Sequence, residues 1–583
     1  VGSEMCIRDR VDIIGLYIKK YMCMINKIGV DTTSRINGIE ARKNKKEGQT
    51  PNFKGGGNLL LQGIQYCEKV PMVNVAVVDM LSAILPRTIV ESMTNWFAGF
   101  EAFRRESSGL VVNCLIPSLI TLGFAKMLNG STMGGLGKKI DMSECWADSS
   151  LINEAKEYYN KSASSDKVKD ALRNILGDIE GFEGKEKIVF KDALSAEELD
   201  KYADRLAELS RSNKSNKDLG KEVKKISAEI VDKTRVAENV KIAGIKNEVK
   251  ASSVNGMLVD SVKFFKGFQS RSQGTIEDFA RKSKNLVRAK SGLGLAVILP
   301  LAISMQYINR WITGKVSGVK GAPIYDDFAK GKDNIEQDPA AKEGLLKQKI
   351  ISISSMIGVS LLSMMKKPTL GMLEFKGMFP TMDQARVIST ATFASRMAAA
   401  DDKNELAEST VRDIATFSGL YFLGDYADKG AATLIEKTKG VRLLNDTKPL
   451  KADANVFEKF WHWVKDVKVK SSDEVVSKTA ELLKKQGKTP DAEQLKIIEK
   501  ELKHAVNLRS ACQATNIGVS LALLGILVPI YTRHNTKKKH ERALKLAQEN
   551  AQTQTENKEQ TETLTPLNVK YSKLTAGFRA DKR

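Results

Sequence analysis

Histidines, glycine-rich turns and acidic runs are the features of this 583-residue chain that could do chemistry, but none has the spacing a known site needs. The tripeptide GKT at 487–489 resembles the end of a phosphate loop, yet Leu482 stands where that loop needs its first glycine. The acidic residues between Asp401 and Glu405 lack the glycine of a calcium loop. The four histidines form no H-E-x-x-H motif and no nucleophile pattern. We therefore predict no enzyme activity, no catalytic or metal-binding residue and no cofactor.

The first ten residues, VGSEMCIRDR, resemble translated read-through from a sequencing adapter. We expect residues 1–23 to be a gene-prediction artefact and the true start to be Met24 or Met22, so 1–23 are left out of fold reasoning. Four cysteines then remain, namely Cys67, Cys114, Cys145 and Cys512. The closest two are 31 residues apart and none forms a C-x-x-C pair, which favours buried free thiols in a reducing compartment.

Composition excludes several classes of protein. Lys and Arg number 92 against 70 Asp and Glu, giving a net charge of +22, and 42% of residues are hydrophobic. These values exclude a disordered chain, a collagen-like chain and a small disulfide scaffold. A mean hydropathy of -0.27 excludes a protein that lies mostly within the membrane. Few aromatics and prolines, with many Ala, Lys, Glu and Leu residues, favour helices.

Four uncharged runs predict membrane spans. A helix needs roughly 20 mostly apolar residues to cross the hydrocarbon layer. The runs are 19, 19, 16 and 23 residues long, and they are Ser107–Ala125, Ser291–Asn309, Ile350–Met365 and Ser510–Thr532. Two weaker segments, Val70–Leu85 and Ile414–Leu423, read as amphipathic helices against the bundle or as marginal spans. Only Asp79, in the first of these two, could serve an ion pathway.

Three predicted spans contain a proline: Pro117, Pro300 and Pro529. Such residues could mark the broken helices of a transporter. Proline is also commoner in membrane helices than in soluble ones, and we favour that explanation.

Aromatic and basic residues flank the predicted spans. Trp and Tyr prefer the membrane–water interface, and we expect four aromatic residues there, namely Trp96, Phe97, Trp311 and Tyr531. A basic cluster follows the last span and is expected to contact anionic lipid head groups; it consists of Arg533, Lys537, Lys538, Lys539 and Arg542. The positive-inside rule then makes the C-terminus cytoplasmic, in a bacterial cytoplasmic membrane. With four spans, the N-terminal region is also expected to be cytoplasmic.

A further aromatic cluster, Phe457–Val464, places four rings in eight residues. Its rings could lie at a membrane interface, stack on nucleic-acid bases or form a small helical core. The sequence leaves these three alternatives open.

Charged helical regions separate the spans. Ser195 and Glu198 predict a capping box ahead of a helix. Leu219–Ile245 shows a helical period that includes Val236 and Val240. The resulting organisation is the expected artefact at 1–23, a flexible region at 24–69, amphipathic helices and the first span at 70–128, a charged helical domain at 129–290, a hairpin of two spans at 291–365, a second charged helical domain at 366–509, the last span at 510–532 and a basic, low-complexity tail at 533–583.

These observations predict an all-α, multi-span membrane protein with large charged helical regions outside the bilayer. We expect a structural, anchoring or interaction role in a bacterial envelope, with the lipid bilayer and protein partners on the charged helices. One alternative is a transporter or channel that uses the proline-containing spans. The other is a soluble, basic, helical protein that binds nucleic acid, which the spread of positive charge along the whole chain disfavours.

Overall fold

The structure is a computed structural model. It describes residues 56–94, 96–130, 147, 149–246, 248–271, 274–317, 339–364, 373–376, 379–401, 403–451, 453–477, 492–531 and 534. Helices dominate this part of the chain, and its six strands are between two and five residues long. The predicted all-α class is therefore confirmed.

Within the described residues, five helices are long and apolar enough to cross a membrane. They are Pro71–Met93, Gly99–Leu128, Ile276–Val316, Gly344–Met364 and Lys500–Tyr531. Four coincide with the predicted spans. The first does not: the segment that looked marginal because of Asp79 continues as a helix to Met93, and this length makes it a fifth candidate. Five spans, unlike four, do not place both ends of the chain on the same face of a membrane.

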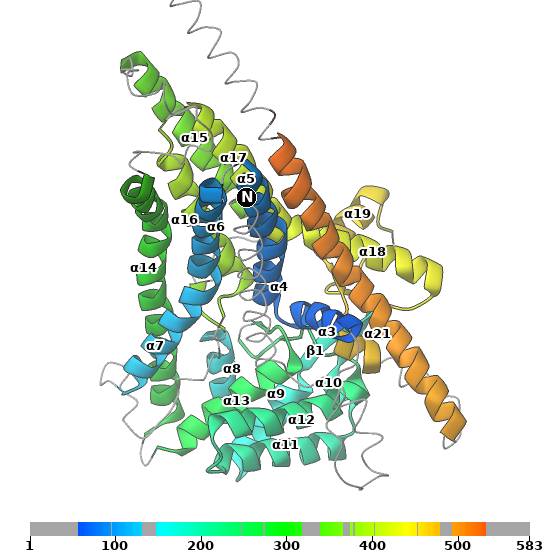
Figure 1. Ribbon diagram of the computed structural model, residues 1–583. Helices are drawn as coiled ribbons and strands as arrows, with labels where there is room; N and C mark the ends of the chain where they lie inside the picture. Colours follow the sequence, from blue (N-terminus) through cyan, green and yellow to red (C-terminus); the bar gives the residue numbers. More distant parts are fainter. Residues whose placement is uncertain are drawn as a thin grey trace, which may run out of the picture.

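The candidate spans assemble into a bundle together with α16 and α17, which are more polar than the spans (Figure 1). The bundle contains α4 (Pro71–Val78), η1 (Asp79–Ile84), α5 (Leu85–Thr94), α6 (Trp96–Leu110), η2 (Val111–Leu115), α7 (Ile116–Gly130), α14 (Ile276–Ser317), α15 (Pro339–Met364), α16 (Met382–Ala398), α17 (Lys403–Ser418), η6 (Gly419–Leu423), α21 (Ala492–Ser520) and η7 (Leu521–Leu527). α16 packs against both α14 and α15, and α17 packs against α15. Each candidate span also exposes large apolar side chains, as lipid-facing helices do; examples are Leu81, Leu119, Val297, Leu362 and Ile530.

Three of the π-helical segments, η1, η2 and η7, end two residues before a proline: Pro86, Pro117 and Pro529. The residue just before each proline donates its N–H five positions back, from Leu85 to Met80 and in the same way at the other two sites. A proline ring clashes with the carbonyl four positions back, and the wider turn relieves that clash. The helices are therefore widened and remain continuous, and the broken-helix interpretation is wrong here. Pro300 lies inside α14 with no π segment at its position.

A separate domain, the 149–290 domain, lies at one end of the bundle and includes the first part of α14 (Figure 1). It contains α8 (Ser149–Lys161), α9 (Lys167–Gly177), β1 (Ile179–Glu183), β2 (Glu186–Val189), α10 (Phe190–Ala193), α11 (Ala196–Arg211), α12 (Asn216–Thr234), β3 (Lys241–Ile242), β4 (Val249–Lys250) and α13 (Val254–Gln269). Its strands form one antiparallel sheet in the order β2-β1-β3-β4.

Two predictions for this domain can be compared with the structure. The capping box of Ser195 and Glu198 is confirmed at the start of α11. The helical period over Leu219–Ile245 is wrong beyond Thr234, because Arg235 adopts a left-handed backbone (φ 63°) and ends α12. Val236 and Val240 are still buried, but they pack from extended chain that leads into the sheet.

The remaining described elements lie around α21 (Figure 1). They are α3 (Gly56–Lys69), α18 (Gly424–Lys439), β5 (Leu444–Asp446), α19 (Val456–Lys465) and β6 (Val467–Val469). β5 and β6 pair antiparallel, and β5 also contacts β1 of the separate domain.

Candidate functional site

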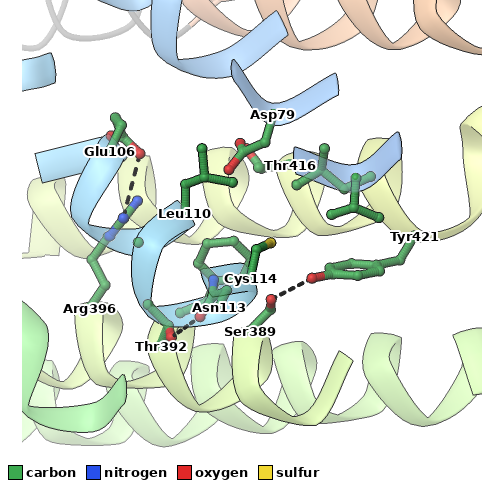
Figure 2. Close-up of a pocket in the computed structure, with 14 residues that line it drawn as sticks. Asp79, Glu106, Leu110, Asn113, Cys114, Ser389, Thr392, Arg396, Thr416 and Tyr421 are labelled. Atoms are coloured by element: carbon green, nitrogen blue, oxygen red, sulfur yellow. Dashed lines mark hydrogen bonds and ion pairs between the residues drawn. The ribbon is translucent and has the colours of Figure 1, made fainter. Parts of the chain in front are cut away.

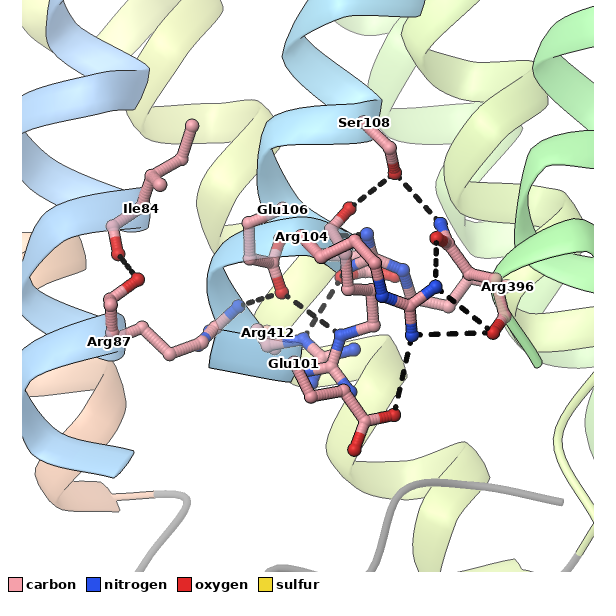
Figure 3. Close-up of polar contacts among 12 residues, drawn as sticks. Ile84, Arg87, Glu101, Arg104, Glu106, Ser108, Arg396 and Arg412 are labelled. Carbon is pink, nitrogen blue, oxygen red and sulfur yellow. Dashed lines mark hydrogen bonds and ion pairs between the residues drawn. The ribbon is translucent and has the colours of Figure 1, made fainter. Parts of the chain in front are cut away.

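Glu106 on α6 is the centre of a buried charged cluster (Figure 3). Its carboxylate lies 2.6 Å from Nη1 of Arg87 on α5, 3.5 Å from Nε of Arg105 and 3.6 Å from Nη2 of Arg396 on α16. All four side chains are at most 12% exposed. One carboxylate therefore joins three helices through three guanidinium groups.

Asp413 on α17 extends the cluster. Its Oδ1 lies 2.8 Å from Nη1 of Arg396 and 3.2 Å from Nε of Arg412. Its Oδ2 is buried and has no hydrogen-bond partner within the described part of the chain. The Glu106 and Asp413 carboxylates thus contact four arginines, and Arg396 lies between the two carboxylates.

A second polar contact joins α6 to α14. Arg104 donates to Oδ1 of Asn309 at 3.2 Å and to Oγ1 of Thr313 at 2.8 Å. Thr313 in turn donates to the Glu101 carboxylate, and Asn309 donates to Oγ of Ser108 at 2.7 Å. These bonds hold the two spans together at the same end of the bundle as the charged cluster (Figure 3).

A small cavity lies next to the charged cluster, where three π-helical segments meet (Figure 2). Asp79 comes from η1, Asn113 and Cys114 from η2, and Tyr421 from η6. The volume is about 20 Å³, which is enough for about one water molecule. A solute larger than water therefore has no room in this conformation.

The walls of the cavity combine apolar side chains, such as Leu110 and Phe393, with polar ones. Thr392 donates to Oδ1 of Asn113 at 3.0 Å, and Ser389 shares a 2.6 Å hydrogen bond with the Tyr421 hydroxyl. Among the residues that the structure describes, none forms an ion pair or a hydrogen bond with the Asp79 carboxylate. This arrangement can hold a water molecule or a proton. No group of three or more His, Cys, Asp or Glu side chains suited to a metal ion occurs among the described residues.

The predicted interface residues are only partly described. Trp96, Trp311 and Tyr531 are exposed, and their helices end on the same side of the bundle in Figure 1. Phe97 belongs to α6, but its side chain lies outside the described residues, as does the basic cluster Arg533, Lys537, Lys538, Lys539 and Arg542. Interface and lipid contact at these positions stay predictions.

Sequence reasoning identified Asp79 but missed the charged cluster. Arg87, Arg105 and Glu106 lie outside the uncharged runs, and Arg396 and Asp413 lie in a region predicted to be a charged domain outside the bilayer. No protein-family model, curated protein or solved structure matches this chain.

Proposed function

We propose that this protein is a membrane anchor that holds the 149–290 domain at one face of a bacterial cytoplasmic membrane, in a structural or interaction role. The observation that carries the proposal is the continuity of α14, which is a single 42-residue helix. Its first half contributes Phe279 and Leu286 to the core of the domain. Its second half contributes Ile298 and Ala302 to the core of the bundle. Because α14 belongs to both cores, it fixes the position of the domain relative to the bundle.

Two polar contacts between other elements support a fixed attachment, one of them beside α14, where Arg288 also lies 3.6 Å from the Glu374 carboxylate. Glu374, in the segment before α16, accepts hydrogen bonds from the backbone N (3.0 Å) and Oγ (2.6 Å) of Ser149. On another side, Glu474 accepts from the backbone N–H groups of Ala237 and Glu238, both at 3.3 Å. Burial raises the pKa of Glu474, so the carboxyl depends on these donors to ionise. With these additional attachments, the domain cannot pivot freely about α14.

The charged cluster supports an anchor through its contacts. The Glu106 and Asp413 carboxylates link α5, α6, α16 and α17, so polar groups hold the bundle together where burial of apolar surface in lipid gives no net attraction. The positive residues after Tyr531 favour a cytoplasmic location for that end. The 149–290 domain lies at the opposite end in Figure 1, so the proposal puts it on the outer face.

Alkaline extraction of membranes tests the anchor. We expect the protein to remain in the pellet after an alkaline wash and to dissolve only in detergent. Protease added to intact spheroplasts should cut the 149–290 domain, whereas the C-terminal tail should be cut only in inverted vesicles. Release without detergent would contradict the proposal that the protein is integral to the membrane. The reverse protease pattern would show the opposite orientation.

A flexible insertion tests whether the domain is held rigidly. Spin labels on α11 and α15 should give one narrow distance distribution in the wild-type protein. A Gly-Ser-Gly insertion after Lys290 interrupts α14 between its two cores and should broaden that distribution. The matched control is the same insertion after Asn213, which lies in the exposed connection between α11 and α12. A broad distribution in the wild-type protein would contradict rigid anchoring.

The Asp79 cavity favours one second candidate, a pathway for protons. An intramembrane carboxylate beside a water-sized, partly polar cavity is a common element of proton relays. Proteoliposomes containing a pH-sensitive dye distinguish the two functions. An anchor gives no proton flux. A flux that Asp79→Asn abolishes and Glu91→Gln retains would favour the relay, because Glu91 shares the same span but does not line the cavity.

A further inference from the structure

The short helix α19 has an aromatic face that no described part of the chain covers. Val456 is 83% exposed, Phe457 72%, Phe460 57% and Trp461 50%, and no residue of the helix is buried. Positions 457, 460 and 461 share one face of a helix. These rings therefore do not form the small helical core that was one interpretation of the sequence.

The opposite face and the start of α19 explain why it is ordered. Asn455 and Glu458 form a complete capping box at its N-terminus. Lys429 of α18 donates to the carbonyl oxygens of Trp463 and Val464 at 2.8 and 3.0 Å. The Trp463 indole N–H donates to Oγ1 of Thr433, also on α18, at 3.0 Å. α19 is thus fixed to α18 by its polar side while the aromatic face is directed away.

α18 in turn is fixed to a candidate membrane span. It packs along α21, where Arg509 lies 3.2 Å from the Asp428 carboxylate and Asn516 donates to Asp425 at 3.4 Å. Figure 1 shows α19 beside the upper half of α21, away from the 149–290 domain. If α21 crosses a bilayer, α19 is held next to that bilayer.

The chemistry of the exposed face matches the head-group region. Phe457 and Trp461 stack with ring centroids 6.5 Å apart, and the exposed Lys459 and Lys465 belong to the same helix. Helices that lie flat in the interface combine Trp and Phe on one face with lysines beside them. α18 adds Leu434, which is 63% exposed, so the apolar surface continues beyond α19.

We propose that α19 lies in the head-group region of the bilayer, with Phe457, Phe460 and Trp461 inserted among the lipids. Its partner is the phospholipid surface that α21 crosses. This arrangement gives α18 a fixed depth relative to the membrane. The inference depends on the chain being a membrane protein, but it does not depend on the role of the 149–290 domain.

Quenching of tryptophan fluorescence by brominated phospholipids tests this proposal. The full-length protein is placed in phosphatidylcholine–phosphatidylglycerol vesicles whose lipids carry bromine near the head group. Trp461→Phe should remove a large share of the quenched signal. Trp463→Phe is the matched control, since it changes the same residue type two positions away on the inner face, and it should remove much less. Both substitutions keep an aromatic ring, so the fold should be preserved, and circular dichroism verifies this.

Two results would overturn the proposal. The first is a Trp461 signal that brominated lipids leave unchanged and aqueous acrylamide quenches fully, because it would mean that the face is in water. The second is protection of Trp461 by a single-stranded oligonucleotide with a steep dependence on salt, because it would make the aromatic face a base-stacking surface. The anchor proposal is judged separately, since alkaline extraction does not depend on α19.

Discussion

Replacing Glu106 by Gln is expected to destabilise the helical bundle strongly. Gln has nearly the same shape as Glu but lacks the negative charge that three buried guanidinium groups share. Arg396 keeps Asp413 as a partner at 2.8 Å. Arg87 has Glu106 as its only carboxylate partner within the described residues, at 2.6 Å. The substitution therefore leaves the Arg87 charge buried and unbalanced.

The magnitude follows from the distances. At an effective dielectric constant of about 20, each contact of 2.6 to 3.6 Å corresponds to about 5 to 6 kcal/mol of attraction. Desolvation of the four groups and repulsion among the arginines offset most of this sum. Removing one partner of a buried pair typically costs about 3–5 kcal/mol, and we expect Glu106→Gln to fall in that range.

Equilibrium unfolding in mixed micelles with increasing SDS measures this difference. The control is Asp401→Asn, which removes a carboxylate 2.7 Å from Arg310. Asp401 is 58% exposed, so its loss should cost at most about 1 kcal/mol. The double variant Glu106→Gln, Arg87→Met should recover part of the loss, because the unbalanced charge is removed as well. A Glu106→Gln protein within about 0.5 kcal/mol of the wild type would refute the reasoning.

Three further predictions concern helix packing, titration and capping. Gly525→Ala should destabilise the bundle by about 1–3 kcal/mol, because the new Cβ would lie 3.1 Å from the Ser82 carbonyl oxygen. The control is Gly518→Ala on the same span, whose Cβ would have no atom within 4 Å, and it should be neutral or stabilising in the same SDS titration. Burial raises the pKa of Asp428 to about 6, so between pH 4 and 6 the folded protein keeps a proton that the unfolded chain has lost. Stability should therefore fall by roughly 3 kcal/mol as the pH rises through that window, and a slope that Asp428→Asn leaves unchanged would contradict the assignment. Ser195→Ala removes the capping box of α11 and should cost the 149–290 domain about 1 kcal/mol, seen as earlier loss of hydrogen-exchange protection in α11; unchanged protection there would contradict the role of the cap.

Local patterns in the sequence predicted the spans well. Four uncharged runs coincide with four of the five candidate membrane helices, because the length of an apolar run is a property of neighbouring residues. The segment around Asp79 was predicted to be at most a marginal span because Asp79 interrupts its apolar run. The helix continues to Met93, and this length makes it a fifth candidate span. The capping box at Ser195 was also predicted, since all its hydrogen bonds lie within four residues.

The charged cluster could not be predicted in this way. Arg396 and Glu106 are 290 residues apart in the sequence, and nothing near either residue indicates that they meet. α16 and α17 carry enough polar residues to resemble helices outside the membrane, and their burial depends on how α14 and α15 pack around them. The same limit applies to the aromatic cluster at Phe457–Val464, because its three interpretations depend on which neighbours cover its rings.

The sequence by itself determined that the chain is mainly helical, which segments are apolar enough for a bilayer, and where the capping box of α11 lies. These properties depend on contacts within one or two turns of the same helix. Only the tertiary structure decided which charges are buried, where a water-sized cavity forms beside Asp79, and that the rings of Phe457, Phe460 and Trp461 remain uncovered. Burial and ion pairing depend on residues from distant parts of the chain, so they exist only once the helices have packed together.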